Sequence, residues 1–331
     1  MKAARTVAPG DTRIVELPDP VPGPGEVVCR VLACATCGSD VQDWYVARKL
    51  PAILGHEPTG EVVAVGDGVR VVAAGDRVAI HHHAPCGVCA RCVAGHETLC
   101  AQFRSTHLDP GGFAEQVLVQ RELVDELLPL DGLDPVVATF TEPLACALRG
   151  QARVGVGAAD RVLVVGAGCS GLLNIAALRG RRSGSDAGGG RAAPAAVFVV
   201  EPDAARRALA ESWGAVPYDG SPVDVAIACT PKPDAIRAAA DALDIGGRLL
   251  VYAPPAPGTP LSIDAGELFL RELTVTASWS AGPADMRASL AMLQGGFDPS
   301  GLIGLRVGLD GTGEALRAQA TGAVFKAVVE P

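Results

Sequence analysis

Four cysteines constrain this chain more than any other feature, because they lie within fifteen residues at the spacing C-x2-C-x2-C-x7-C. They are Cys86, Cys89, Cys92 and Cys100. Thiolates at this spacing can converge on one tetrahedral zinc ion. Disulfides and an iron–sulfur cluster are the alternatives; a reducing compartment weakens the first, and the second usually needs a different spacing. A site closed by four thiolates leaves no open coordination position, so the sequence predicts a structural zinc here and a reactive site elsewhere.

The start of the chain and its charge limit the compartment and the partners. Met1-Lys2 leads into a polar, Pro-rich stretch without the apolar core of a signal peptide. The longest apolar run, residues 162–178, is broken by glycines and polar residues, so no membrane span is expected. These features predict a cytoplasmic protein. The net charge of −9 argues against a nucleic-acid partner, because a phosphate-binding face needs a basic excess.

Two domains are expected for 331 residues, and the pattern of residues along the chain changes near Pro135. Before it, short alternating runs separated by Gly- and Pro-rich turns predict a β-rich region over about residues 1–135, with strands at 26–32, 60–65 and 77–81. After it, a helix predicted at 137–149 is followed by apolar strands that alternate with Ala-rich helices. Those strands are predicted at 161–165, 196–201, 223–229, 248–252 and 273–277. Such alternation predicts a parallel sheet covered by helices on both faces. The Gly- and Ser-rich segment 181–195 is predicted to be a mobile surface loop.

A glycine-rich turn follows the first of these later strands and opens a helix. Its sequence, Gly166-Ala167-Gly168-Cys169-Ser170-Gly171, matches G-x-G-x-x-G, in which glycines let backbone amides approach a pyrophosphate. Glu201 ends the next apolar strand, where an acidic residue binds the ribose hydroxyls and repels a 2′-phosphate. The turn therefore predicts dinucleotide binding, and Glu201 favours NAD over NADP. Arg206 and Arg207 are a caution, because arginines near this point can accommodate a phosphate.

Three short stretches carry further metal-ligand chemistry: Cys37-Gly38-Ser39-Asp40, Gly55-His56-Glu57 and Thr141-Glu142-Pro143-Leu144. A thiolate, an imidazole and a carboxylate are three ligands that leave a fourth position open, as in catalytic zinc sites. Spacing alone does not show that residues so far apart converge. Each also has a structural interpretation: Cys37 as a buried thiol, His56 as a core histidine, Glu142 as a carboxylate at a helix start.

In this order along the chain, the C-G-S-D, G-H-E, four-cysteine, E-P-L and G-A-G-x-x-G stretches resemble the zinc-dependent medium-chain dehydrogenase/reductase superfamily. The likeness covers essentially the whole chain. The presence of glutamate at position 142 resembles the sorbitol (polyol) and threonine dehydrogenase branch. The resemblance implies an α/β fold with a GroES-like β-rich catalytic domain and a Rossmann doubly wound parallel sheet. The implied ranges are 1–135 with 285–331 for the GroES-like domain and 136–284 for the NAD-binding domain. A homodimer or homotetramer is implied as well.

Carried over onto this chain, the resemblance implies two zinc ions, one structural and one catalytic. Cys37 and His56 would be ligands of the catalytic ion, Glu142 a third ligand directly or through water, and Glu57 an exchanging ligand. Ser39 would pass the substrate's hydroxyl proton outward. The implied chemistry is Lewis-acid activation of an alcohol, followed by hydride transfer to the nicotinamide.

Two departures from the family and a run of histidines are expected to matter. Gln42 stands where much of the family ends its proton relay in histidine, and the segment between Tyr218 and Val223 is too short for a further helix. His81-His82-His83 is not expected to bind one ion, because adjacent residues of a strand point to opposite faces. By resemblance, His82 lines the substrate pocket.

The expected enzyme oxidises a secondary alcohol of a polyol, cyclitol or amino sugar to the ketone with NAD. Trp44, His82 and Trp279 are the candidate residues for binding this small hydroxylated substrate, although both tryptophans have structural interpretations as core or interface residues. Within the same chemistry, threonine or a vicinal diol of the butanediol type is the alternative. A zinc-independent quinone reductase would lack the metal residues. A non-catalytic nucleotide or redox sensor on the same fold would have no need of an open zinc site.

Overall fold

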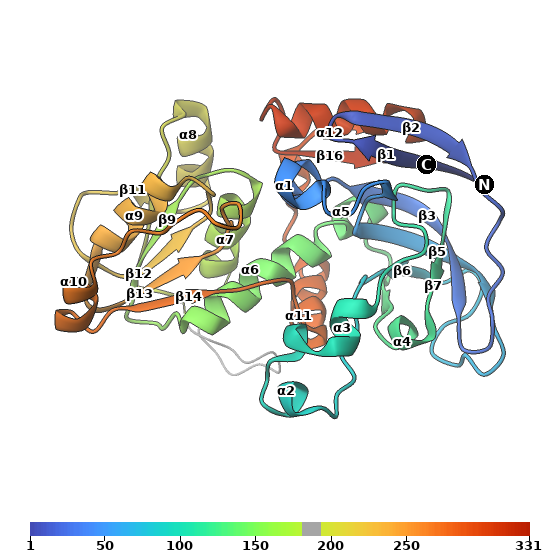
Figure 1. Ribbon diagram of the computed structural model, residues 1–331, viewed down its shortest axis with the longest axis horizontal. Helices are drawn as coiled ribbons and strands as arrows, with labels where there is room; N and C mark the ends of the chain where they lie inside the picture. Colours follow the sequence, from blue (N-terminus) through green and yellow to red (C-terminus); the bar gives the residue numbers. More distant parts are fainter. Residues whose placement is uncertain (181–192) are drawn as a thin grey trace. The chain divides into compact units, whose positions relative to one another are not determined.

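The computed structural model describes residues 1–180 and 193–331, and the chain divides into two compact units (Figure 1). The first unit combines Met1–Pro143 with Ala281–Pro331, and the second is Leu144–Ser280. One unit is β-rich and the other holds a parallel sheet, so the predicted α/β class is confirmed. Most of the loop predicted at 181–195 lies outside the described residues. No helix in the described ranges combines the length and apolar character needed to cross a membrane.

The first unit is built mostly on antiparallel strands, with β15 and β16 paired in parallel. One sheet has the order β2-β1-β4, and the other has the order β15-β16-β3-β5-β6-β8, with β7 also paired to β3. The strands are β1 (Lys2–Ala8), β2 (Asp11–Glu16), β3 (Val27–Ala35), β4 (Ala52–Ile53), β5 (Glu57–Val65), β6 (Arg77–Ala79), β7 (Gln116–Val119), β8 (Leu128–Pro129), β15 (Ile303–Val307) and β16 (Lys326–Val329). Strands from the two ends of the chain thus lie in one sheet, where β16 pairs with β3.

Short helices fill the connections of this unit. They are η1 (Gly38–Val41), α1 (Asp43–Val46), α2 (Ala90–Val93), η2 (Glu97–Leu99), α3 (Ala101–Ser105), α4 (Arg121–Val124), α5 (Pro135–Ala138), α11 (Pro283–Gln294), η3 (Ser300–Leu302), η4 (Leu309–Gly311) and α12 (Thr312–Ala320). Apolar residues of β3, β5, β6 and β7 form its main core, together with Phe113 and residues of α4 and α12. The helices α1 and α12 lie near the end of β3 that carries the site described below (Figure 1).

The register between β3 and β5 determines which residues meet at one end of this sheet. These strands are antiparallel, with Ala35 at the end of β3 opposite Glu57 at the start of β5. On the other side of β3, β16 is also antiparallel, with Val328 opposite Ala35. The residues just after β3 therefore lie beside those at the starts of β5 and β16.

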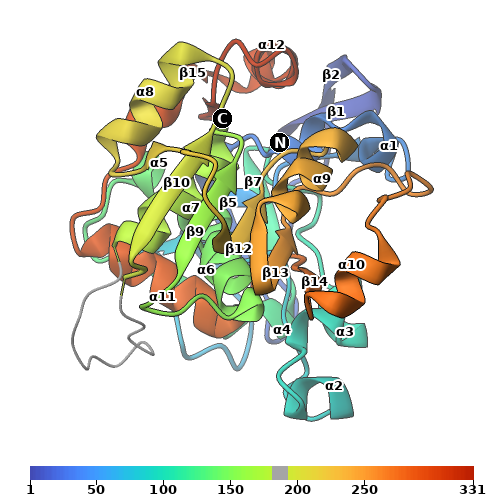
Figure 2. The same ribbon diagram turned by 90° about the vertical axis from the view of Figure 1, so that its left-hand side faces the viewer.

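The second unit is a parallel sheet with the order β11-β10-β9-β12-β13-β14, in which every strand pair is parallel (Figure 2). Its strands are β9 (Arg161–Val165), β10 (Ala196–Val200), β11 (Val216–Pro217), β12 (Val223–Ala228), β13 (Leu243–Val251) and β14 (Thr274–Ala277). Its helices are α7 (Cys169–Arg179), α8 (Ala204–Ser212), α9 (Pro233–Asp241) and α10 (Ala265–Leu270), while α6 (Thr141–Val154) begins in the first unit. This order, 3-2-1-4-5-6 in chain sequence, is that of a doubly wound dinucleotide-binding sheet.

Several predicted elements differ in detail from the structure. The strand predicted at 77–81 ends at Ala79, so the three histidines lie in the loop that follows β6. The helix predicted at 137–149 is two helices, α5 and α6, separated by a turn at Thr139 and Phe140. Residues 218–222 contain no helix, as their small number implied.

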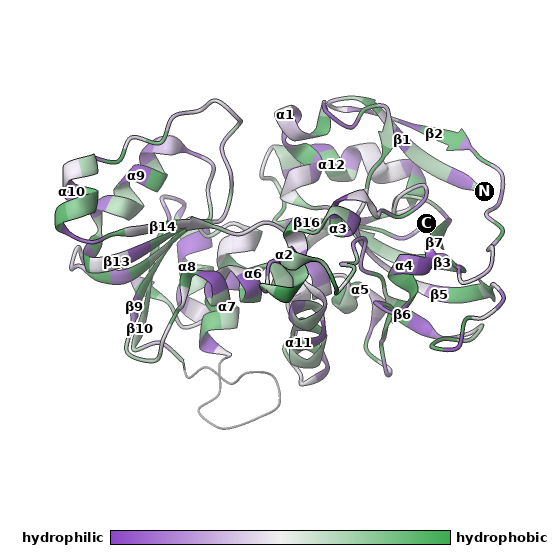
Figure 3. Ribbon diagram, turned by 60° about the horizontal axis from the view of Figure 1, so that its bottom comes forward, coloured by the Kyte–Doolittle hydropathy of each residue, from purple (hydrophilic) through white to green (hydrophobic). Residues whose placement is uncertain are grey.

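Helix α10 carries the most exposed large apolar side chains of the second unit. Phe269 is 79% exposed and its neighbour Leu270 is nearly as open, and the hydrophobic colour of α10 is visible in Figure 3. Ile245, before the middle of β13, is similarly exposed.

Candidate metal and dinucleotide sites

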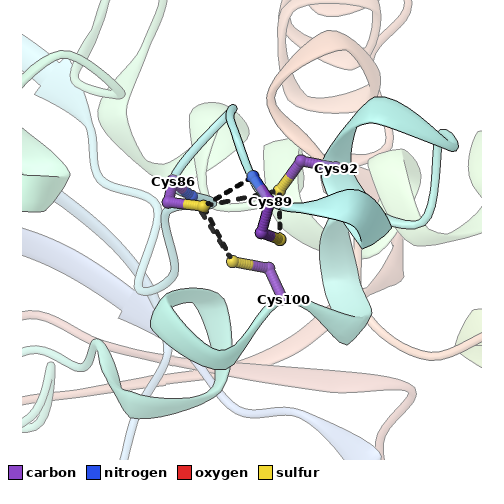
Figure 4. A group of neighbouring side chains, drawn as sticks. All are labelled: Cys86, Cys89, Cys92 and Cys100. Carbon is purple, nitrogen blue, oxygen red and sulfur yellow. Dashed lines mark hydrogen bonds between the residues drawn. The ribbon is translucent and has the colours of Figure 1, made fainter.

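The four cysteines of the first unit point toward one another (Figure 4). The sulfur–sulfur distances are 3.5 Å for Cys89 and Cys92, 3.6 Å for Cys86 and Cys100, and 4.0 Å for Cys86 and Cys92. Zinc–sulfur bonds of about 2.3 Å in a tetrahedron require sulfurs about 3.8 Å apart, so the four thiols fit a zinc ion.

Short helical turns bring these thiols together. Cys89 caps α2, Cys100 caps α3, and η2 lies between them. Backbone amides support the sulfurs, because the amide of Cys89 donates to Cys86 Sγ at 3.4 Å and the amide of Cys86 donates to Cys100 Sγ at 3.5 Å. The ring of Phe103 belongs to the same buried cluster as the four cysteines. The donors of this site all come from one local loop.

A second group in the first unit brings together Cys37, His56 and Glu57. One ligand atom from each lies within 4.8 Å of the others. Cys37 directly follows the end of β3 and His56 directly precedes β5, so the register of Ala35 opposite Glu57 brings the thiol and the imidazole to one place. A sulfur, a nitrogen and a carboxylate oxygen are the donor types of a catalytic zinc site.

Asp40 orients both Cys37 and His56. Its Oδ2 accepts the Cys37 backbone N–H at 3.0 Å, and its Oδ1 lies 3.3 Å from His56 Nδ1. A histidine that binds metal usually donates its other ring N–H to a carboxylate, so Asp40 would leave His56 Nε2 facing the ion. Burial would raise the pKa of Asp40, but the His56 imidazole and the Cys37 N–H lower it. Burial would also lower the pKa of His56, yet Asp40 and Cys37 hold it well above its usual range.

The carboxylate of Glu57 is buried between this group and Lys326. Its Oε2 accepts a short hydrogen bond from the Lys326 ammonium, whereas its Oε1 is buried and has no hydrogen-bond partner in the described part of the chain. Burial raises the pKa of Glu57, an effect that Lys326 opposes and Glu142 reinforces. An oxygen that is buried without a donor, beside a thiol and an imidazole, is suited to a cation.

The other predicted residues of this site lie close to it but outside the group within 4.8 Å. Glu142 is buried at the start of α6 and near enough to influence the pKa of Glu57. Ser39 is half-buried on η1, between Cys37 and Asp40. Gln42 follows η1 and caps α1, which carries Trp44. Trp44 is half-buried and makes an edge contact with the ring of Tyr45.

The three consecutive histidines gather without forming a metal group in the described residues. The His82 ring lies 5.0 Å from the His56 ring and 4.0 Å from the His83 ring, measured between centroids. His81 is buried against Phe103, and neither of its ring nitrogens has a hydrogen-bond partner among the described residues. Burial lowers the pKa of His81 to about 3, so this ring is neutral. Because the loop departs from strand geometry, the expected alternation of faces does not apply, but His82 does reach His56.

In the second unit, the glycine-rich turn joins β9 to α7. Gly166 has a φ of +96°, which favours glycine, and a Cβ at Gly171 would lie 1.9 Å from the Gly166 carbonyl oxygen. A Cβ at Gly168 would meet nothing within 4 Å, which leaves an open approach at the start of α7. These are the three roles that a dinucleotide fingerprint gives its glycines: a tight turn, close approach of a pyrophosphate, and close packing of helix on strand.

Glu201 lies directly after β10 and is bound to this turn. Its Oε2 accepts the Ala167 N–H at 2.7 Å, and its Oε1 accepts the Asp203 N–H at 3.0 Å. The Arg207 guanidinium donates to the Glu201 carbonyl at 2.8 Å, and Arg206 precedes it on α8; both arginines are half-buried. Trp279, after β14, is 41% exposed.

Sequence reasoning missed three residues that lie around the group of Cys37, His56 and Glu57. Asp40 stands inside the C-G-S-D stretch, but no role was assigned to it. Lys326 carried a usable signal, because a lysine within the apolar run 323–329 is rarely buried unless it is paired. Gln319, on α12, contacts Thr36 and offered no signal of its own.

Comparison with known proteins shows the family of this chain. Residues 23–129 match the family model of the alcohol dehydrogenase GroES-like domain, and residues 190–295 match that of zinc-binding dehydrogenases. The chain is 35% identical to L-threonine 3-dehydrogenase of Pyrococcus furiosus, over 79% of this chain and 78% of that protein. It is 31% identical to D-altritol 5-dehydrogenase of Agrobacterium fabrum, over 89% and 88%. A structure from Sinorhizobium meliloti, described as a zinc-binding dehydrogenase bound to NADP, superimposes with a TM-score of 0.86 at 29% identity, covering 100% and 99%.

The four-cysteine loop should depend on its ion for order. Cys86→Ser, or incubation with a zinc chelator, is expected to speed tryptic cleavage after Arg91 severalfold, because metal binding supplies the free energy that holds such a loop. Arg91 is exposed between Cys89 and Cys92. Cleavage after the exposed Arg13 is the internal control, and it should not change. Equal cleavage after Arg91 in wild type and variant would show that the loop holds its shape without metal.

Proposed function

The chain belongs to the zinc-dependent medium-chain dehydrogenase/reductase superfamily, and we propose that it oxidises a secondary alcohol of a polyol, cyclitol or amino sugar to the ketone with NAD. It is an NAD(P)-dependent zinc-type alcohol dehydrogenase acting on a small molecule. The observation that carries the proposal is the Cys37, His56 and Glu57 group, whose imidazole is already oriented by Asp40. A non-catalytic sensor would have no use for this open donor set.

We propose two zinc ions per chain, each with its own residues. Cys86, Cys89, Cys92 and Cys100 would hold the structural ion. Cys37 and His56 would hold the catalytic ion, with Glu142 as a third ligand directly or through water and Glu57 as an exchanging ligand. When bound there, zinc supplies Lewis-acid chemistry that makes the alcohol proton easier to remove.

This chain's own residues would then handle the proton. Ser39, next to Cys37, would accept the hydroxyl proton of the substrate and pass it outward. Gln42 cannot exchange a proton at useful pH, so the relay beyond Ser39 would end in water or at Asp43. With a metal bound, His56 would present its unprotonated Nε2 to the ion, because its Nδ1–H would be donated to Asp40.

The dinucleotide would bind the second unit at the carboxyl end of β9. Gly166, Gly168, Cys169, Ser170 and Gly171 would form the pyrophosphate turn, where α7 presents backbone amides. Glu201 would accept the ribose hydroxyls, because backbone amides fix both of its oxygens and each oxygen keeps a further lone pair. Its charge would repel a 2′-phosphate, which supports NAD. Arg206 is the residue that would reverse this preference.

His82 supports a polar, multiply hydroxylated substrate. Its ring lies 5.0 Å from that of His56, and its Nδ1 is buried without a partner among the described residues. A hydroxyl or amino group next to the reacting carbon would find a hydrogen-bonding group there instead of an apolar wall. Trp44 and Trp279 are the proposed aromatic contacts. Threonine and vicinal diols share this pattern of adjacent polar groups and remain the alternative substrates, and one relative is a threonine dehydrogenase.

The domain roles and the assembly are part of the same proposal. Residues 1–135 and 285–331 would form the catalytic, zinc-binding domain, and residues 136–284 the NAD-binding domain. The active form would be a homodimer or homotetramer.

Metal analysis and a substrate panel test the proposal directly. The wild type should contain about two zinc ions per chain. Cys37→Ser should lose one ion together with activity, and Cys86→Ser should lose the other. NADH formation, with NADP in parallel, is measured across polyols, inositols, aminocyclitols, sugars, threonine and butanediol. A wild type with one zinc, retained in Cys37→Ser, would remove the catalytic assignment.

Two glycine variants separate binding from folding in the dinucleotide turn. Gly168→Ala should fold normally, because its extended backbone suits any residue and its Cβ meets nothing. It should weaken NAD binding by at least about tenfold, or about 1.4 kcal/mol, by crowding the pyrophosphate. Gly171→Ala should instead lower the free energy of unfolding by about 1–3 kcal/mol, since its Cβ overlaps the Gly166 carbonyl. Calorimetric titration with NAD and thermal unfolding measure the two effects. Wild-type affinity in Gly168→Ala would place the pyrophosphate elsewhere.

His82→Phe tests the polar wall of the pocket. The variant should lower kcat/KM for the best polyol roughly fivefold to tenfold, the size of one lost hydrogen bond of about 1 kcal/mol, and should favour plain aliphatic alcohols. His107→Phe is the matched control, because His107 is an exposed histidine that bonds only locally, to the Ser105 carbonyl in the contacts seen. Unchanged polyol activity in His82→Phe would remove His82 from substrate recognition.

A further inference from the structure

A buried lysine joins the two segments that carry the proposed catalytic zinc ligands. Lys326 begins β16, and its side chain is only 2% exposed. Its ammonium donates to the Glu57 carboxylate and, at 2.9 Å, to the Thr36 carbonyl. Thr36 immediately precedes Cys37, and Glu57 immediately follows His56. One cation therefore contacts the chain beside each of the two ligands.

Stability alone does not account for this ion pair. The Lys326 ammonium lies 5.5 Å from the centre of the Phe140 ring, and the residues that follow it on β16 are buried and apolar. Removing two such charges from water costs several kcal/mol per ion, and apolar replacements of buried pairs are often neutral or stabilising. The pair therefore needs another explanation, and its position beside the metal group suggests one.

Glu57 lies between the Lys326 ammonium and the candidate metal group. One of its oxygens is bound by Lys326, and the other is buried with no hydrogen-bond partner in the described residues. The carboxylate also has an oxygen within 4.8 Å of the ligand atoms of Cys37 and His56. Lys326 and a metal ion in this group would thus compete for the same carboxylate.

The thiol side of the site is held by contacts that do not involve the Glu57 carboxylate. With its amide oriented to satisfy its neighbours, Gln319 donates to the Thr36 carbonyl and accepts the Gly38 N–H, both at 3.1 Å, and so spans Cys37. The Thr36 hydroxyl and the backbone of Ala327 exchange two further hydrogen bonds. These contacts fix the Thr36 carbonyl, which in turn fixes where the Lys326 ammonium lies.

We propose that Lys326 is a positioning residue that holds the Glu57 carboxylate back from the catalytic metal and so keeps one coordination position available to the substrate. The argument rests on the proposed function only in requiring a metal at Cys37 and His56. Without the lysine, the freed carboxylate would become a permanent ligand, close the site and retain the ion more strongly.

The rate of zinc release measures how strongly the site retains its ion, and the measurement needs no substrate. Wild type, Lys326→Met, Glu57→Gln and the double variant are mixed with an excess of a chromogenic zinc chelator, and the phase that Cys37→Ser lacks is assigned to the catalytic site. Lys326→Met should slow that phase by about tenfold or more, within the range that partners of metal ligands typically control. In the Glu57→Gln background the same substitution should change nothing, because no carboxylate is left to be released.

Two further variants serve as controls. Lys326→Arg should keep the wild-type rate, since it restores a cation to Glu57. Arg306 is an exposed cation on the neighbouring strand β15, where it pairs with Glu330. Arg306→Met should also leave the rate of zinc release unchanged. Should Lys326→Met fail to fold, Lys326→Gln, which keeps a donor for Thr36 but no charge, takes its place.

The outcomes separate this inference from the function on which it rests. A wild type that shows no Cys37-dependent zinc phase overturns the proposed function. A wild type with that phase, and an unchanged or faster rate in Lys326→Met, overturns the role of Lys326 alone. An equal slowing with and without Glu57 would also overturn it, because the lysine would then act on the metal only through its charge.

Discussion

The antiparallel pairing of β3 with β5 is the interaction on which the candidate metal site depends. Ala35 lies opposite Glu57, so Cys37 and His56, which are nineteen positions apart in the chain, meet at one end of the sheet. The pairing of β16 on the other side of β3 brings Lys326 to the same end. A shift of one residue in either register would turn these side chains to the opposite face and disperse the group. The metal chemistry proposed for this chain would thus follow from strand register.

Charges of alternating sign surround this end of the sheet. Asp40 faces His56, and Glu57 faces Lys326, while Glu142 adds a further carboxylate nearby. Each of these groups is shielded from water, so each depends on its partner to remain charged. An apolar core would be easier to stabilise, and a local violation of the usual burial rules is what functional sites commonly show. The same arrangement orients the donors before any ion arrives.

Local sequence patterns make part of the fold and of the candidate sites predictable. The remaining part depends on the register of strands that are distant in the chain, which no local pattern specifies. The four-cysteine loop and the glycine turn are encoded within fifteen residues or fewer, and their spacing alone indicates their geometry. The strands of the parallel sheet follow from apolar runs of one segment each. The convergence of Cys37 with His56 needs the pairing of β3 and β5, which no spacing states. Lys326 comes from the far end of the chain, and only its burial within an apolar strand distinguishes it. The predicted strand 77–81 is too long, because β6 ends at Ala79 and the histidines that follow lie in a loop where their rings pack together.

The two metal groups of the first unit differ in what builds them, and this difference bears on their roles. The four-cysteine group consists of one loop with short helical turns, so its donors have little besides the ion and a few amide contacts to hold them in place. The Cys37 group is placed by strands from three distant parts of the chain and braced by Asp40, Gln319 and Lys326. Donors held by the sheet do not need the ion to fix their positions, so the ion can exchange a ligand without disturbing the fold. Chemistry at a metal requires such an exchange, whereas a loop that relies on its metal for shape must keep every ligand bound. The distribution of hydrogen bonds around the two groups therefore supports the proposed structural role of one and the proposed reactive role of the other.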